Sequence, residues 1–123
     1  MVIPASLGSS YYIVVKHRNS VETWNSNPLS FGGTTVSYNF SSSAGQAFGN
    51  NLKLIAGKYV VQVGDINQDG IIDANDFVAV DNDAANFLSG YLNTDVNGDG
   101  FVDEADFTMV NSNASVFVGK ITP

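Results

Sequence analysis

The sequence predicts an α+β protein: a small antiparallel β-sheet or partial β-sandwich over residues 1–64, then a pair of loop–helix units over residues 65–123. Three observations support this division. Short runs before residue 64 alternate apolar and polar residues, which is typical of half-buried strands. From residue 65 onward the sequence repeats with a period of 30 residues. Within each repeat, the apolar spacing becomes helical after an Asp-rich loop.

The first half contains several short segments with strand character. They are residues 11–18, 21–24, 34–40, 52–55 and 58–63. β-branched and aromatic residues are frequent in them, and Val36, Tyr38 and Phe40 share one face of the third segment. A complete β-sandwich takes roughly 100 residues. We therefore expect the sheet to be covered by the second half of the chain or completed by another chain.

The second half carries two copies of one twelve-residue loop, from Asp65 to Asp76 and from Asp95 to Asp106. In both copies, positions 1, 3, 5, 6, 9 and 12 hold Asp, Asn, Asp, Gly, Asp and Asp. A calcium loop needs oxygen donors at this spacing, a glycine at position 6, and only a backbone carbonyl from position 7. The candidate metal ligands are Asp65, Asn67, Asp69, Ile71, Asp73 and Asp76 in the first loop, and Asp95, Asn97, Asp99, Phe101, Asp103 and Asp106 in the second.

The charge distribution also indicates cations. The formal charge of −7 divides into +3 through residue 64 and −10 beyond it. Four Asp side chains in each loop repel one another unless a cation neutralises them. Ca²⁺ suits these oxygens better than Mg²⁺, which prefers a smaller octahedral shell, or Zn²⁺, which prefers nitrogen and sulfur. We expect two Ca²⁺ ions, one in each loop.

Each loop is followed by a predicted helix. Phe77, Val80, Ala84 and Phe87 lie at i, i+3, i+7 and i+10, and identical residues recur thirty positions later. We expect both helices to begin near loop position 12 and to bury all four phenylalanines, which are Phe77, Phe87, Phe107 and Phe117. Since no convincing helix precedes either loop, the two loop–helix units should pack about a pseudo-twofold axis.

Residues 65–118 resemble the type I dockerin module, a tandem pair of calcium loop–helix units with Asp at position 12. The resemblance implies two calcium ions and a role in the non-covalent assembly of extracellular proteins. Cellulosomal dockerins usually present a hydroxyl pair at loop positions 10 and 11, where this sequence has Ala74-Asn75 and Glu104-Ala105. Residues 10–64 resemble β regions that precede dockerin-like repeats in large secreted surface proteins of Bacteroidetes-type bacteria.

We predict a secreted, calcium-binding structural or assembly module, extracellular or on a cell surface, that is not an enzyme. The sequence has no Gly-rich phosphate loop, no nucleophile–base pair and no cysteine. The expected partner is a protein, either copies of this chain in a fibre or surface layer or a cohesin-like domain. The scarcity of Lys and Arg in the acidic half disfavours nucleic acid as its partner, and we expect none. No apolar run is long enough for membrane insertion.

A third possibility is an accessory carbohydrate-binding module of a secreted enzyme. It rests on aromatic residues of the first half, which are Trp24, Tyr11, Tyr12 and Tyr38. Packing within the sheet or at its edge is the expected role of these rings. Asn39 and Asn113 each begin an N-glycosylation sequon, and the sequence leaves open whether either is modified.

Overall fold

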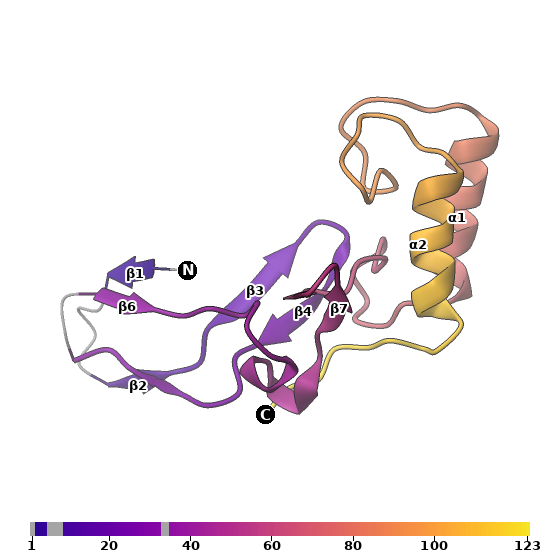
Figure 1. Ribbon diagram of the computed structural model, residues 1–123. Helices are drawn as coiled ribbons and strands as arrows, with labels where there is room; N and C mark the ends of the chain where they lie inside the picture. The colour runs from indigo at the N-terminus through magenta and orange to yellow at the C-terminus, as the bar shows by residue number, and fades with distance from the viewer. Residues whose placement is uncertain (1, 5–8, 33–34) are drawn as a thin grey trace. The chain divides into compact units, whose positions relative to one another are not determined.

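The computed structural model describes residues 2–4, 9–32 and 35–123 (Figure 1). The chain forms two compact units. The first contains residues up to Val15 together with Thr23–Val61 and Ile121–Pro123, and the second contains Lys16–Glu22 and Gln62–Lys120. Small antiparallel sheets and two helices confirm the predicted α+β class. None of the helices in the described ranges is long and apolar enough to cross a bilayer.

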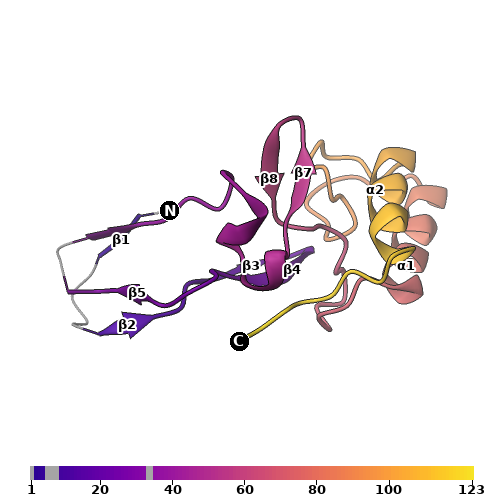
Figure 2. The ribbon, with the colours of Figure 1, turned by 60° about the horizontal axis from the view of Figure 1, so that its bottom comes forward.

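The strands pair in twos, and each pair is short. The pairs are β1 (Val2–Pro4) with β6 (Thr35–Ser37), β2 (Ser10–Tyr11) with β5 (Leu29–Ser30), β3 (Val14–His17) with β4 (Ser20–Trp24), and β7 (Lys53–Ile55) with β8 (Lys58–Val60). Figure 2 shows the β7–β8 hairpin, in which Leu54 lies opposite Tyr59. Two 3₁₀ helices, η1 (Ala44–Gln46) and η2 (Phe48–Asn50), occupy the small, polar segment before β7. Isolated bridges extend the pairing of β4, from Ser20 to Val63 and from Thr23 to Ile121.

The first unit has a small apolar core and three pairs of aromatic rings. Ile13 and Phe31 are buried, with Leu29, Val36 and Tyr38 packed against them. Edge-on ring pairs join Tyr11 to Phe31 at 5.5 Å, Tyr12 to Trp24 at 5.7 Å, and Tyr38 to Phe40 at 4.8 Å between centroids. The hydroxyl of Tyr38 also donates to the carbonyl of Gln46. Packing is therefore the role in which the structure shows these rings.

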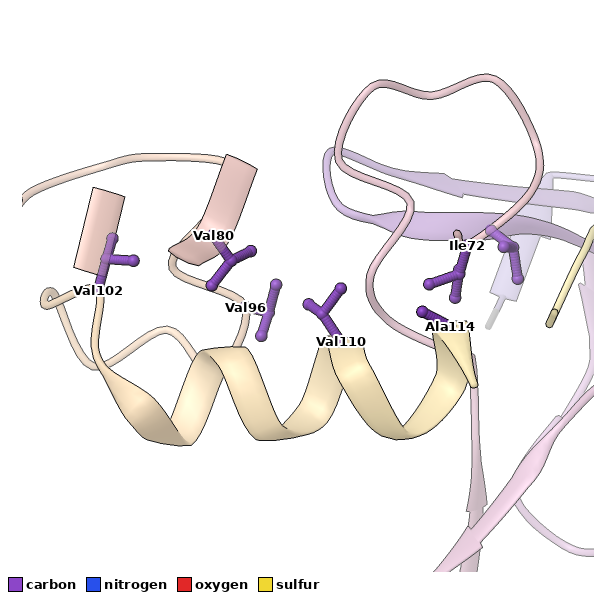
Figure 3. Packing of buried hydrophobic residues seen from close by; sticks show 7 residues of the cluster. Ile72, Val80, Val96, Val102, Val110 and Ala114 are labelled. Carbon is purple, nitrogen blue, oxygen red and sulfur yellow. The ribbon is translucent and has the colours of Figure 1, made fainter. Parts of the chain in front are cut away.

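The second unit is built on two packed helices, α1 (Ala74–Ala85) and α2 (Glu104–Ala114). Its buried core consists of Val21, Ile72, Val80, Val96, Val102, Val110 and Ala114 (Figure 3). Ile72 and Val102 occupy loop position 8, so both loops direct one apolar side chain into the core. Phe77 and Phe107 pack against this core and meet edge-on, with centroids 5.9 Å apart.

Backbone hydrogen bonds join the two loop–helix units reciprocally. The amide of Ile72 in the first loop donates to the carbonyl of Val118 after α2, at 2.7 Å. The equivalent amide of Val102 in the second loop donates to the carbonyl of Leu88 after α1, at 3.0 Å. A second reciprocal pair runs from Lys120 to Gly70 and from Gly90 to Gly100, both at 2.8 Å. Each bond is the thirty-residue counterpart of another, as the expected pseudo-twofold arrangement requires.

Two of the four predicted core phenylalanines are exposed. Phe87 is 88% exposed and Phe117 is 74% exposed, so the prediction is wrong for both. Each follows the end of its helix and has a left-handed backbone, with φ of 52° and 51°. The helical spacing of apolar residues continues past the point at which the backbone stops being helical. The periodic pattern therefore included one residue too many in each repeat.

Candidate calcium sites

The Asp at loop position 12 is fully buried in both loops and organises the backbone around it. Asp76 and Asp106 are each 0% exposed. In both loops, Oδ1 accepts hydrogen bonds from the amides of positions 2 and 3, at 2.8 and 3.3 Å for Asp76 and at 2.8 and 3.0 Å for Asp106. Oδ2 accepts from the amide of position 9, at 2.9 Å in the first loop and 3.0 Å in the second. This Asp therefore closes the loop onto the first turn of the helix.

Position 9 begins the helix. Asp73 and Asp103 are the N-caps of α1 and α2, and each accepts a hydrogen bond from the amide two residues later, at 2.8 and 2.9 Å. With Asp76 and Asp106 as the N3 residues, both helices have a complete capping box. Negative side chains at a helix N-terminus are also favoured by the helix dipole. The sequence thus determines both helix starts locally.

Positions 3 and 5 form tight local turns. Asn67 and Asn97 accept from the amide two residues later at 2.9 and 3.0 Å, and Asp69 and Asp99 do the same at 3.0 and 2.9 Å. The position 7 side chains, Ile71 and Phe101, are exposed, in keeping with a residue expected to offer only its carbonyl. The two loops therefore share one hydrogen-bond pattern at positions 3, 5, 9 and 12.

Position 1 differs between the loops. Asp95 Oδ1 accepts from the amides of Gly98 and Asp99 at 2.9 and 3.2 Å, and its Oδ2 accepts from Gly100 at 2.9 Å. Asp65 Oδ2 accepts from the equivalent amide of Gly70, at 3.1 Å. Asp65 Oδ1, in contrast, is buried and has no hydrogen-bond partner among the described residues.

The environment of Asp65 favours a cation. Its burial raises the pKa of the carboxyl group; the amide of Gly70 opposes this shift, and the charges of Asp76 and Asp69 reinforce it. A buried carboxylate oxygen without a partner is costly, so such groups are normally paired or coordinate metals. A hard, oxygen-seeking ion such as Ca²⁺ would satisfy this atom and offset the neighbouring charges.

Three carboxylates of the second loop come together. Oxygens of Asp95, Asp99 and Asp106 lie within 4.8 Å of one another, from loop positions 1, 5 and 12. In the described part of the chain, the corresponding acids of the first loop do not form such a group. Asp103 also lies outside the group and caps α2. An all-oxygen set of this kind fits Ca²⁺, which binds carboxylate and carbonyl oxygens.

Two residues near the second loop were missed by sequence reasoning. Asn19 is 1% exposed, and its Nδ2 donates to the carbonyls of Asn93 and Asp95 at 3.2 and 3.3 Å. The guanidinium of Arg18 donates to the same Asp95 carbonyl at 3.4 Å and lies 4.0 Å from the ring centroid of Tyr91. The only sequence signal was a turn at Asn19, and a turn does not indicate a contact more than seventy residues away.

The second unit is thus a tandem pair of loop–helix units with two sets of acidic, oxygen-donating residues. Residues 63–113 match the family model of the Dockerin type I domain. Comparisons with curated proteins and with solved structures give no match. The chain therefore contains a dockerin-like segment, which confirms the resemblance seen in the sequence. Dockerin domains are Ca²⁺-binding modules that dock a protein partner, and they occur in extracellular or cell-surface proteins.

Proposed function

We propose that this chain is a secreted, non-catalytic assembly module in which two Ca²⁺ ions, one in each loop, stabilise a docking surface for a protein partner. The supporting observation is the doubled loop: a buried Asp at positions 1 and 12 and a helix-capping Asp at position 9 occur twice, within a segment that matches a docking module. Two ions would change the formal charge from −7 to −3.

Calcium would act on folding stability. A ligand that binds only the native state adds RT ln(1 + [L]/Kd), or about 4 kcal/mol when its concentration is about 1,000 times Kd. Weak extracellular calcium modules have Kd values on the order of 10⁻⁴–10⁻³ M. Asp65 and the Asp95–Asp99–Asp106 group are the places where an ion would relieve a buried or repulsive charge.

Calorimetric titration of the chelator-stripped chain tests this proposal. We expect two ions bound per chain and a melting temperature far lower in EDTA than in calcium. Asp65→Asn and Asp95→Asn should each remove one bound ion and leave the other, because each changes position 1 of a different loop. A melting curve that is the same in EDTA and in calcium would overturn the proposal.

The partner we propose first is a cohesin-like protein domain, because the dockerin match favours docking. Loop positions 10 and 11 are exposed in both loops and carry Ala74-Asn75 and Glu104-Ala105 in place of a hydroxyl pair. A partner that contacts these positions would therefore face two alanine methyl groups, the side-chain amide of Asn75 and the carboxylate of Glu104. Binding assays against a cohesin panel, with and without calcium, test this assignment, and calcium-independent binding would contradict it.

Self-assembly into a fibre or surface layer is the second candidate. The two-stranded sheets of the first unit favour it, because a strand from another copy can add to the edge of a small sheet. A head-to-tail contact that does not close generates a filament. Sedimentation at high protein concentration in calcium should then show large species, and a monomer there would contradict this candidate. Glycan binding through Trp24 stays a prediction, and a Trp24→Ala variant with unchanged glycan binding would contradict it.

A further inference from the structure

A pocket of about 430 Å³ lies on the second unit, between the end of α1 and the start of α2. Ala84, Phe87, Val102 and Phe107 give it apolar walls. Its acidic residues are Asp81 on α1, and Asp103 and Glu104 at the start of α2. The pocket thus combines aromatic surface with carboxylates, and Asp103 is the only one of its residues among the candidate calcium ligands.

Phe87, which lines this pocket, has an energetically unfavourable conformation and environment. Its side chain is 88% exposed, and its backbone adopts a left-handed φ of 52°. A left-handed conformation costs a residue other than glycine roughly 1–2 kcal/mol. Because the ring is exposed, it gains little free energy from the burial of apolar surface. Phe87 is not among the residues that form the core of the unit or pack against it, whereas Val102 and Phe107 are. An exposed aromatic ring beside a pocket is typical of a binding surface.

The acids of the pocket have no cationic partner in the described chain. The ion pair found among the described residues joins Lys16 to Glu22, at 3.2 Å. Neither Asp81 nor Glu104 is paired with a basic side chain there, and both are exposed. The surrounding half of the sequence carries a formal charge of −10. This surface therefore attracts cationic groups.

The internal repeat shows that the calcium loops do not require these two acids. The thirty-residue counterparts of Asp81 and Glu104 are Asn111 and Ala74, which are neutral. The counterparts of Phe87 and Phe107 are again phenylalanines. Both repeats form the same loop and the same capped helix. Asp81 and Glu104 therefore make one of the two pseudo-equivalent faces acidic, and for each acid the loop and helix form without it in the other repeat.

We propose that this pocket binds a lysine or arginine side chain of the protein partner. The aliphatic part of the side chain would lie against Phe87 and Phe107, and its charged end beside Asp81 and Glu104. Long basic side chains combine apolar packing with a charged end in this way. The inference rests on the proposed docking function and specifies the chemistry of the partner at one point. It also assigns the docking contact to one of the two pseudo-equivalent faces.

The test uses the full-length, ¹⁵N-labelled chain loaded with calcium. The probe is an acetylated, amidated peptide, Ala-Leu-Arg-Leu-Ala, and its control contains citrulline, a neutral analogue of similar shape, in place of arginine. We expect the arginine peptide to shift the amide signals of Phe87, Glu104 and Phe107. The citrulline peptide should bind about fivefold more weakly, since two partly exposed ion pairs are lost.

Two variants and one matched control complete the experiment. Asp81→Asn/Glu104→Gln should reduce binding of the arginine peptide to the level of the citrulline peptide, and Phe87→Ala should weaken both peptides. Glu22→Gln/Asp83→Asn removes two negative charges from the second unit outside the pocket. It also removes the Lys16–Glu22 ion pair and alters the acceptor of the Thr94 hydroxyl, so its folding is checked by circular dichroism, and it should leave binding unchanged. Equal binding of the two peptides, or full binding to Asp81→Asn/Glu104→Gln, would overturn the pocket assignment alone. Failure of the chain to load calcium would instead overturn the proposed function.

Discussion

Asp106 shows how much of one loop depends on a single side chain. Its two oxygens accept three backbone amides, and the side chain is fully buried. In Asp106→Asn an NH₂ group replaces one oxygen, so at least one buried amide loses its acceptor and faces another donor. We expect a loss of about 1–3 kcal/mol in the free energy of unfolding in calcium. Calorimetry should also show one bound ion fewer, and urea denaturation measures the stability.

Asp81→Asn is the control for this substitution. It removes the same charge from the second unit, but Asp81 is exposed and lies outside both loops. Exposed substitutions of this kind change stability by about 0.5 kcal/mol or less, and the number of bound ions should stay at two. If the two variants lose stability equally, the effect comes from charge alone, and the role given to Asp106 is wrong.

Phe87 occupies the residue after the helix cap, where proteins usually place glycine. The amides of Phe87 and Leu88 donate back to the carbonyls of Ala84 and Asp83, both at 3.1 Å, and these two bonds define a Schellman ending. Phe87→Gly removes the left-handed strain and loses little buried surface. The greater freedom of glycine in the unfolded chain offsets part of this gain. We expect a melting temperature that is unchanged or a few degrees higher, measured in calcium by circular dichroism.

Phe77→Ala gives the opposite result at a residue of the same type. Phe77 packs against the core and meets Phe107 edge-on. Truncating it should cost roughly 2–3 kcal/mol, somewhat less than truncation of a fully buried phenylalanine. The informative comparison is that Phe77→Ala should lower the stability of the protein, whereas Phe87→Gly should leave it unchanged or raise it. A large loss of stability in Phe87→Gly would show that the exposed ring supports the fold.

The turn between β3 and β4 acts as part of the second unit. Besides the two bonds of its side-chain amide, Asn19 accepts the amide of Gly64 on its carbonyl, at 2.6 Å. Val21, the second residue of β4, lies in the core of that unit. Asn19→Ala leaves the carbonyls of Asn93 and Asp95 without this donor. We expect a loss of about 1–3 kcal/mol in calcium, measured by urea denaturation.

Asn39→Ala is the matched control for the turn. Asn39 is exposed, and among the described residues its side chain accepts from the nearby Ser41. Its removal should change the free energy of unfolding by less than that of Asn19. Equal losses would mean that the bonds from Asn19 to the second unit contribute nothing specific.

The elements that could be predicted from sequence are those whose structure is decided locally. Each calcium loop closes on side chains within twelve residues, so the identity of Asp76 or Asp106 is enough to predict the bend around it. The same holds for the helix starts, because N-cap and N3 are both aspartates. Helix ends were predicted less well. Phe87 and Phe117 continue the apolar period, but a Schellman turn depends on backbone geometry that periodicity does not report.

The pairing of strands that are distant in the sequence could not be predicted. β1 pairs with β6 and β2 with β5, across intervals filled by other strands, and short alternating segments do not specify which partner each strand takes. The contacts of Asn19 with the second loop belong to the same class. In the sequence, a buried asparagine in a turn cannot be distinguished from an exposed one, because its burial depends on contacts with a distant segment.

At the scale of the whole molecule, charge is the property that the sequence distributes most unevenly. The half that contains both calcium loops carries −10, and the remainder carries +3. Without calcium, repulsion among the acids should oppose folding, and salt should relieve it because the Debye length falls from about 10 Å at 0.1 M to about 3 Å at 1 M. In EDTA we therefore expect the melting temperature to rise with sodium chloride between those concentrations. In calcium, the two ions that we propose would offset four negative charges of the loops, so the rise should be much smaller. Thermal melts followed by circular dichroism compare the two states directly, and the calcium-loaded chain serves as the control for general salt effects. An equal salt dependence in both states would show that repulsion between the loop acids does not limit the stability of the calcium-free protein.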